Sequence, residues 1–234
     1  MKTAKVLLIP IGITEENTDT LPIYIIDYLN ACDVFFVEDL RTARRAFKKI
    51  NKQFDIDSKT WYEIGKEEKE KINDFKRAIQ EGKTIGIASE SGCPGIADPG
   101  QMLISLAQQN NIPVKPLVGP SSILLTLMAS GLNGQHFTFN GYLPIQQMDR
   151  AKKIKELEKK MLAENCTQLF IETPYRNNQL LQSLLQHLDN KTALCIGYHL
   201  TSDEEWIKTK SVGDWKKSNL EIPKQPTMFG IGLL

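Results

Sequence analysis

Short apolar segments alternate with helix-like segments through the first half of the chain. KVLLIP precedes LPIYIIDYLN, DVFFVE precedes RTARRAFKKI, WYEI precedes EKINDFKRAIQ, and TIGIA precedes QMLISLAQQN. Short runs rich in β-branched residues are typical of strands, whereas apolar residues recurring every three to four positions indicate helices. Such alternation buries parallel strands under helices on both faces. The first half therefore predicts an open α/β domain with a mostly parallel sheet.

The second half predicts another α/β domain. The alternation resumes after Pro116 and includes a long amphipathic helix from about 150 to 164. From Thr201 onward EEWIKTK, SVGDWKK and QPTMFGIGLL are short, and the tryptophans among them favour strands of a second, mixed sheet. We place the boundary near 114–119, with domains over 1–114 and 118–234.

Composition indicates a globular chain without a membrane span. Hydrophobic residues make up 41% and charged residues 24% of the 234 residues, the balance of a soluble protein with a sizeable core. No apolar run approaches the roughly 20 residues that cross a bilayer, and the N-terminus shows no signal-peptide pattern. These features predict a cytoplasmic protein.

The four cysteines are expected to be reduced thiols. Cys32, Cys93, Cys166 and Cys195 lie far apart, with no CxxC pair and no histidine at a spacing typical of zinc sites. The sequence therefore predicts no metal.

Net charge does not favour a nucleic-acid partner. Lysine and arginine total 29 against 28 acidic residues, a formal charge of +1, which is small for a protein that holds polyanionic RNA. A local basic surface would compensate, and we identify two basic runs: Arg41, Arg44, Arg45, Lys48 and Lys49, and Arg150, Lys152, Lys153 and Lys155. The alternative for each run is a solvated helix face.

Two glycine-bearing loops predict a ligand site. The buried-strand pattern at 84–88 ends in a loop with Gly92, Gly95 and Gly100, and a second strand ends in GPSS at 119–122. Glycine lets main-chain groups approach a ligand, and ligands of open α/β sheets bind at the carboxyl ends of strands. The alternative for the first loop is a tight connection in which Asp98 caps the next helix.

The order of the motifs resembles a known family. KVLLIPIG, VFFVEDLRTARR, SESGCPGIADPG, LVGPSSILLTLMASGL, FNGYLP and ETPYRN occur in the order of the tetrapyrrole methylase superfamily of S-adenosylmethionine methyltransferases. Within it, the chain is most similar to the 2′-O-ribose methyltransferases that act on a cytidine of small-subunit ribosomal RNA. The resemblance implies two α/β lobes with the cofactor S-adenosyl-L-methionine in a cleft between them, and a homodimer.

Two carboxylate–arginine pairs are the predicted catalytic residues. EDLR and ETPYR match family motifs, and they end predicted strands, where ligands bind. Carboxylates facing a ligand are candidates to take a proton from a hydroxyl acceptor. The predicted set is Glu38, Arg41, Glu172 and Arg176. The alternative is that each carboxylate caps a helix or pairs with its own arginine.

The cofactor residues follow from the resemblance. Main-chain atoms of the glycine loops are expected to contact the nucleoside and methionine parts, Ser121 and Ser122 to hydrogen-bond, and Tyr142 to pack beside the ligand. A strand that begins at Pro226 lies by the adenine in relatives. The predicted set is Ser89, Glu90, Ser91, Gly92, Cys93, Gly119, Pro120, Ser121, Ser122, Tyr142, Pro226 and Thr227.

Departures from the family pattern leave the acceptor open. The relatives' RELTK segment reads YHLTS at 198–202 here, without its two basic side chains. The leading interpretation is a divergent ribosomal RNA methyltransferase. A methyltransferase of a tetrapyrrole or other small molecule, and a silent cofactor-binding homologue, are the alternatives. GxGxxG, Walker-type and HExxH motifs are absent, which disfavours other nucleotide and metal enzymes.

Overall fold

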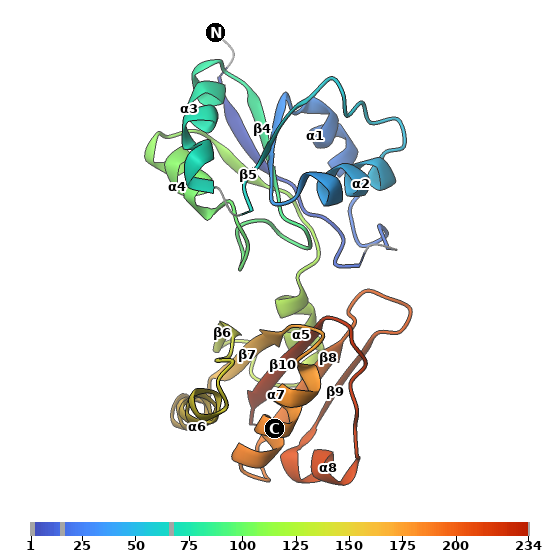
Figure 1. Ribbon diagram of the computed structural model, residues 1–234, viewed down its shortest axis with the longest axis vertical. Coiled ribbons are helices and arrows are strands. Elements are labelled where there is room, and N and C mark those ends of the chain that lie inside the picture. Colours follow the sequence, from blue (N-terminus) through green and yellow to red (C-terminus); the bar gives the residue numbers. More distant parts are fainter. Residues whose placement is uncertain (1–2, 15–16, 66–67, 234) are drawn as a thin grey trace. The chain divides into compact units, whose positions relative to one another are not determined.

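The computed structural model describes residues 3–14, 17–65 and 68–233 (Figure 1). These residues fall into two compact units that divide between Ser121 and Ser122. The predicted domain ends at 1 and 234 lie outside the described residues.

The first unit is built on a five-stranded parallel sheet. The strands are β1 (Lys5–Leu8), β2 (Val34–Val37), β3 (Thr60–Glu63), β4 (Thr84–Ala88) and β5 (Val114–Pro116). Their order in the sheet is β3-β2-β4-β1-β5, and every pairing is parallel. All five carboxyl ends therefore lie along one edge, which is where ligand loops gather in such sheets.

Helices cover both faces of this sheet. Side chains alternate between faces along a strand, so Phe35 packs with α1 (Ile25–Ala31) and α2 (Leu40–Ile50). Its neighbour Phe36 packs with α3 (Ile72–Gln80) and α4 (Gln101–Gln109), on the other face. A 3₁₀ turn, η1 (Glu68–Lys71), leads into α3. Figure 1 shows the two helix pairs on opposite sides of the sheet.

The second unit contains a mixed sheet. Its strands are β6 (Phe137–Tyr142), β7 (Thr167–Glu172), β8 (Ala193–Tyr198), β9 (Trp206–Ser211) and β10 (Thr227–Gly232), in the order β6-β7-β10-β8-β9. Only the β6–β7 pairing is parallel. The last described strand thus lies at the centre of the sheet.

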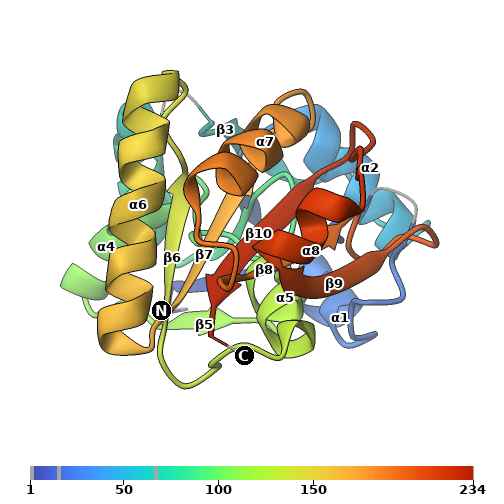
Figure 2. The same cartoon turned by 90° about the horizontal axis from the view of Figure 1, so that it is seen from below.

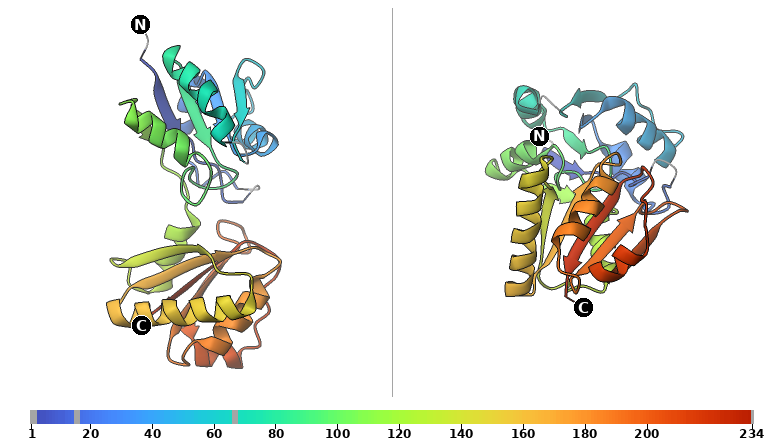
Figure 3. Two further views of the ribbon diagram at one scale, coloured as in Figure 1. Left: turned by 60° about the vertical axis from the view of Figure 1, so that its left-hand side comes forward. Right: turned by 60° about the horizontal axis from the view of Figure 1, so that its bottom comes forward.

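Three helices cover one face of the second sheet and one covers the other. The helices α6 (Gln147–Glu164), α7 (Asn177–His187) and α8 (Val212–Lys217) share a core with Phe170 and Phe229. On the opposite face α5 (Ser122–Ser130) packs against Leu169 and Met228. Figures 2 and 3 show α6 and α5 on opposite sides of the sheet.

The fold class is confirmed, with one correction. A parallel first sheet and a mixed second sheet are present as predicted, but SVGDWKK forms helix α8 rather than a strand. The hydroxyl of Ser211 accepts a hydrogen bond of 3.0 Å from the N–H of Asp214, and this N-cap starts a helix directly after β9. Among the described residues, no helix has the length and apolar character of a bilayer span.

Candidate functional site

Loops from four strands of the first unit meet at the carboxyl edge of its sheet. We call residues 10–12, 38–39, 89–93 and 119–121, which follow β1, β2, β4 and β5, the carboxyl-edge cluster. Ile11 and Gly92 exchange main-chain hydrogen bonds of 2.9 and 3.0 Å, and the carboxylate of Glu38 accepts one of 2.9 Å from the N–H of Glu90. Eight of the predicted cofactor residues belong to this cluster.

Most polar groups of the loop after β4 hold the loop itself in shape. The hydroxyl of Ser89 donates to the carbonyl of Ser91 at 3.0 Å, and the hydroxyl of Ser91 donates to Ile13 at 3.3 Å. With the N–H groups of Glu90 and Gly92 also bonded, the loop is held rigidly before any ligand arrives. Its glycine at 92 has a φ of 67°, a left-handed conformation that favours glycine.

Gly119 is required by close packing. A Cβ at this position would lie 2.1 Å from Cβ of Pro10, far inside van der Waals contact. The thiol of Cys93 lies 3.4 Å from the carbonyl of Pro120. The loops after β1, β4 and β5 are therefore in direct contact.

Carboxylates gather beside these loops. Burial, and then the nearby Glu38 carboxylate, raises the pKa of Asp98 to about 6. Partial burial of its carboxyl, followed by repulsion from Glu38, also raises the pKa of Glu90, although that residue as a whole is exposed. The cluster therefore presents a concentration of negative charge at the sheet edge.

Asp98 is not the helix cap that the alternative interpretation expected. Helix α4 begins at Gln101, and its N-cap is Gly100 in the left-handed conformation, with no side-chain hydrogen bond. Asp98 instead lies half-buried towards Glu38 and Ser89. Sequence reasoning noted its carboxylate but did not include it among the site residues.

The two acidic residues after β2 have different roles. The carboxylate of Asp39 is the N-cap of α2 and accepts from the N–H of Thr42 at 2.7 Å, and that hydrogen bond lowers the pKa of Asp39. Glu38 does not cap the helix. The capping role that the alternative interpretation gave to Glu38 belongs to Asp39. Arg41 is exposed in the first turn of α2.

Helix α2 carries a basic face that reaches the carboxyl-edge cluster. Its buried residues are Ala43 and Phe47, and its exposed cations are Arg41, Arg44, Arg45, Lys48 and Lys49. A pocket lies between this helix and the loops after β1 and β4, lined by Arg45, Lys49, Gly12 and Glu90 among others.

The second basic run differs from its prediction. Arg150 is buried and donates to the hydroxyl of Ser183 at 2.9 Å and to the carbonyl of Ile145 at 2.8 Å. Lys153 pairs with Glu156 at 2.7 Å on the same helix. Helix α6 therefore uses part of this charge to hold the second unit together.

Glu172 and Arg176 form an ion pair in the second unit. Glu172 is 3% exposed at the end of β7, and its Oε1 accepts from two Arg176 nitrogens at 2.9 and 2.7 Å and from the N–H of Thr173 at 2.7 Å. The pairing that the alternative interpretation described is present.

Other predicted residues gather near this ion pair. Thr227 opens β10 directly opposite Glu172, and Tyr142 is exposed at the end of β6, opposite Ile171. The carbonyl of Pro226 accepts from the N–H of His199 at 3.0 Å, so the loop that departs from the RELTK pattern touches the predicted adenine strand.

Asn177 is a site candidate that sequence reasoning missed. Its amide donates to Thr227 at 3.0 Å and to Gln225 at 2.7 Å, whereas its Oδ1 is buried without a hydrogen-bond partner among the described residues. A buried acceptor without a partner is uncommon and marks a place where a ligand donor would be favourable. Only its position at the start of α7, after ETPYR, gave a signal in the sequence.

The predicted residues thus form two groups, one in each unit. Residues up to Ser121 belong to the first unit, and Ser122 opens α5 in the second. The first group centres on the loop after β4, and the second on the facing ends of β7 and β10.

The chain belongs to the tetrapyrrole (corrin/porphyrin) methylase family, whose sequence profile matches residues 5–215. It is similar to the ribosomal RNA small subunit methyltransferase I of Vibrio cholerae, with 31% identity over 183 residues that cover 78% of this chain and 61% of the relative. The protein of the same name from Halalkalibacterium halodurans is 33% identical over 186 residues, covering 78% of this chain and 59% of the relative. The chain spans about three fifths of the length of these curated relatives.

Solved structures share the fold. Diphthine synthase superposes with a TM-score of 0.69 at 13% identity, covering 99% of this chain and 90% of that one. The uroporphyrin-III C-methyl transferase from Thermus thermophilus complexed with S-adenyl homocysteine gives a TM-score of 0.56 at 13% identity, covering 97% of each chain. The predicted family and fold are confirmed.

Proposed function

We propose that this chain transfers a methyl group from S-adenosyl-L-methionine to a ribose 2′-hydroxyl of small-subunit ribosomal RNA. The observation that carries the proposal is its similarity, over 78% of its length, to relatives named ribosomal RNA small subunit methyltransferase I. The tetrapyrrole methylases among the solved structures share the fold at 14 to 15% identity, about half the identity to the ribosomal RNA methyltransferases. A ribosomal RNA acceptor is therefore favoured over a small-molecule acceptor.

The chain offers suitable groups for the methyl donor. In the first unit, Gly119 packs closely against Pro10, and hydrogen bonds hold the loop at 89–93 in place. A ligand at these loops would therefore contact mainly main-chain atoms. In the second unit, the Oδ1 of Asn177, which has no hydrogen-bond partner in the part of the chain that the structure describes, suits an amine or hydroxyl donor of a nucleoside. Ser121, Ser122 and Tyr142 complete the proposed set.

The negative charge of the carboxyl-edge cluster suits a cationic donor. When bound, S-adenosylmethionine supplies a methyl group on a positively charged sulfonium, which needs alignment rather than further activation. Glu38, Glu90 and Asp98 place carboxylates together in the first unit. Their mutual repulsion falls when a cation binds nearby, so these residues favour the sulfonium over its neutral product.

Methylation of a hydroxyl also needs a proton acceptor. Asp98 has a pKa of about 6, so at neutral pH it is largely ionised and able to take a proton. Glu38 and Glu172 are the predicted alternatives. Of these, Glu172 already accepts three hydrogen bonds on one oxygen, so we assign it the role of positioning Arg176.

The basic face of α2 supports an RNA acceptor. Five exposed cations on one helix supply the local positive surface that a net charge of +1 does not show. Phosphate contacts of this kind position an RNA without reading its bases.

The proposed enzyme is a cytoplasmic homodimer. All four cysteines are free, as is usual in a reducing compartment, and ribosomal subunits are found there. Sedimentation equilibrium of the chain tests the dimer.

Labelled methyl donor, incubated with the full chain and isolated small or large ribosomal subunits, tests the acceptor. We expect label in small-subunit RNA, retained in alkali-resistant dinucleotides, because a methylated 2′-oxygen cannot attack the adjacent phosphate. Calorimetry with the donor and its demethylated product tests binding separately. Label in neither RNA, or only in a tetrapyrrole pool, would refute the proposed acceptor, and binding without any transfer would indicate a silent homologue.

A further inference from the structure

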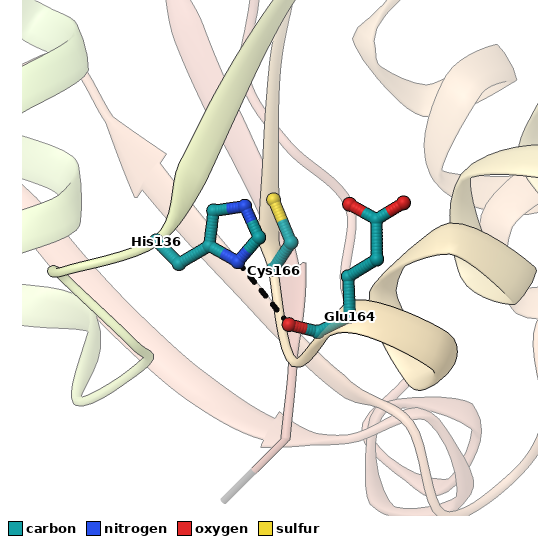
Figure 4. A group of neighbouring side chains, drawn as sticks. All are labelled: His136, Glu164 and Cys166. Atoms are coloured by element: carbon teal, nitrogen blue, oxygen red, sulfur yellow. Dashed lines mark hydrogen bonds between the residues drawn. The ribbon is translucent and has the colours of Figure 1, made fainter.

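A histidine, a glutamate and a cysteine of the second unit come together away from the proposed methylation residues. One ligand atom from each of His136, Glu164 and Cys166 lies within 4.8 Å of the others. Figure 4 shows the imidazole beside the thiol, with the carboxylate of Glu164 beyond the thiol from the imidazole. Cys166 immediately precedes β7, whereas Glu172 ends that strand, so the group lies at the opposite end of the strand.

Parallel strand pairing explains why sequence spacing did not predict this group. Phe137 of β6 is opposite Thr167 of β7, so the residues just before them, His136 and Cys166, are neighbours although 30 positions apart in the sequence. Glu164 ends α6, and Asn165 then turns the chain with a φ of 47°. This turn brings the start of β7 back beside the end of α6, and so beside Glu164.

The imidazole is oriented as in metal-binding histidines. Its Nδ1 lies 3.1 Å from the carbonyl oxygen of Glu164, drawn as a dashed line in Figure 4. A carbonyl only accepts, so Nδ1 carries the proton and Nε2 keeps its lone pair. Histidines that ligate metals commonly donate their second N–H to a backbone carbonyl in this way.

Hydrogen bonds already hold the surrounding backbone in place. The amide of Asn133 donates to the carbonyl of Asn165 at 2.8 Å, and the hydroxyl of Thr167 donates to the carbonyl of Asn133 at 2.9 Å. The N–H of Thr167 donates to the carbonyl of His136 at 2.9 Å. The three side chains therefore project from a fixed corner, which lowers the entropy lost when an ion binds.

We propose that His136, Glu164 and Cys166 form a zinc site that ties the edge strand β6 to the α6–β7 corner. Thiolate, imidazole and carboxylate together are ligands that Zn²⁺ prefers, with bonds of about 2.0 to 2.3 Å. Three atoms within 4.8 Å of one another close on such an ion by rotation of the exposed His136 and Glu164 side chains. Water fills the fourth position, and the thiol proton passes to solvent when the ion binds.

Zinc titration of the untagged full chain, with a phosphine reductant, tests the site. We expect one ion per chain and, at 100 times the dissociation constant, a rise in Tm of about 5 to 10 °C. His136→Gln and Glu164→Gln each weaken zinc binding at least about tenfold, because even changes outside the coordination shell cost that much. His187→Gln, on the half-buried histidine at the end of α7, is the matched control and leaves affinity unchanged.

Cobalt reports the thiolate directly. Bound Co²⁺ should give a sulfur-to-metal charge-transfer band that disappears in Cys166→Ser and persists in Cys32→Ser, whose thiol is buried elsewhere. Zinc should also slow amide hydrogen exchange in β6, since the strand lies at the sheet edge. If Cys166→Ser does not fold, His136→Gln and Glu164→Gln, which change exposed side chains, still test whether zinc binds at this site. An adventitious ion only, seen as equal zinc affinity in the His136→Gln/Glu164→Gln double variant or as cobalt binding without the thiolate band, would overturn the proposal.

Discussion

The carboxylate of Glu38 accepts a 2.9 Å hydrogen bond from the main-chain N–H of Glu90. This contact joins the end of β2 to the loop after β4, across 52 positions of sequence. It also places negative charge close to Asp98 and contributes to the raised pKa of that residue.

Replacing Glu38 should therefore change a neighbour's titration. In Glu38→Gln we expect the pKa of Asp98 to fall below its value of about 6 but to stay above 3.8, because burial is the larger cause of the shift and is unchanged. NMR titration of the Asp98 carboxyl carbon measures this. Glu81→Gln, an exposed change after α3, is the control. An unchanged Asp98 pKa in Glu38→Gln would contradict repulsion between the Glu38 and Asp98 carboxylates.

Asp98 should make stability depend on pH in a defined window. Its folded pKa of about 6 exceeds the ordinary 3.8, so the folded state holds the proton more tightly than the unfolded chain. The associated stability is fully present below about pH 4 and is lost as the pH rises through 6. Asp98→Asn does not have this loss, so its free energy of unfolding relative to wild type should increase between pH 4 and pH 7.

The size of this effect is bounded. At about 1.4 kcal/mol per pKa unit, the gain of Asp98→Asn has an upper limit of about 3 kcal/mol, and solvent reaching the site reduces it. Urea unfolding at both pH values measures it, with Asp57→Asn as an exposed control. A difference that stays constant with pH would refute the raised pKa. The same variant should reduce the preference for S-adenosylmethionine over its demethylated product.

Gly119→Ala should distort the carboxyl-edge cluster. The new Cβ would meet Pro10 at 2.1 Å, and overpacking of this kind costs about 1 to 3 kcal/mol. We expect a lower Tm and weaker cofactor binding by calorimetry. Gly134→Ala is the matched control, because a Cβ there meets nothing within 4 Å. Equal Tm and equal cofactor affinity of the two variants would contradict this prediction, because Pro10 would then move aside without loss of stability.

Arg176→Ala should destabilise the second unit by leaving Glu172 buried and unpaired. Glu172 is 3% exposed. Removing one partner of a buried ion pair lowers the free energy of unfolding by about 3 kcal/mol or more. Glu172→Gln in the same chain should recover much of the loss, which chemical denaturation measures. A full loss of methyl transfer in the recovered double variant would show that the pair also acts on the substrate.

The basic face of α2 should control RNA affinity through salt. Arg44→Gln and Lys48→Gln each remove an exposed cation, and each lost phosphate contact lowers the slope of log affinity against log salt by about 0.7 to 0.9. Filter binding to small-subunit RNA measures the slope. Lys152→Gln, exposed on α6, should leave it unchanged. Equal slopes for all three variants would place the RNA elsewhere.

The local parts of the fold were predictable because periodicity reports which face of a segment is buried. All strands of the first unit and the long helix α6 follow from apolar patterns. Helix α8 was not predicted because the tryptophan in its segment favoured a strand. The helix starts because Ser211, the last residue of β9, is its N-cap, and this depends on where β9 ends. The alternative in which Asp98 caps α4 is wrong, because the N-cap is Gly100, which has no side chain.

Parts of the site were not predictable because they depend on contacts between distant segments. The resemblance indicated the loop at 89–93, but only the folded chain shows that the N–H of Gly92 is bonded to Ile11. The buried Oδ1 of Asn177, without a partner within the described ranges, and the approach of His136 to Cys166 likewise require the strand register. No pattern within a short window of sequence contains that information.

The central place of β10 has a consequence for biosynthesis. Strands β7 and β8 do not pair with each other, and β10 alone joins the β6–β7 ribbon to the β8–β9 ribbon. A nascent chain therefore exposes the open edges of β7 and β8 until β10 leaves the ribosome, and such edges invite aggregation. The second sheet can therefore close only after β10 has been translated.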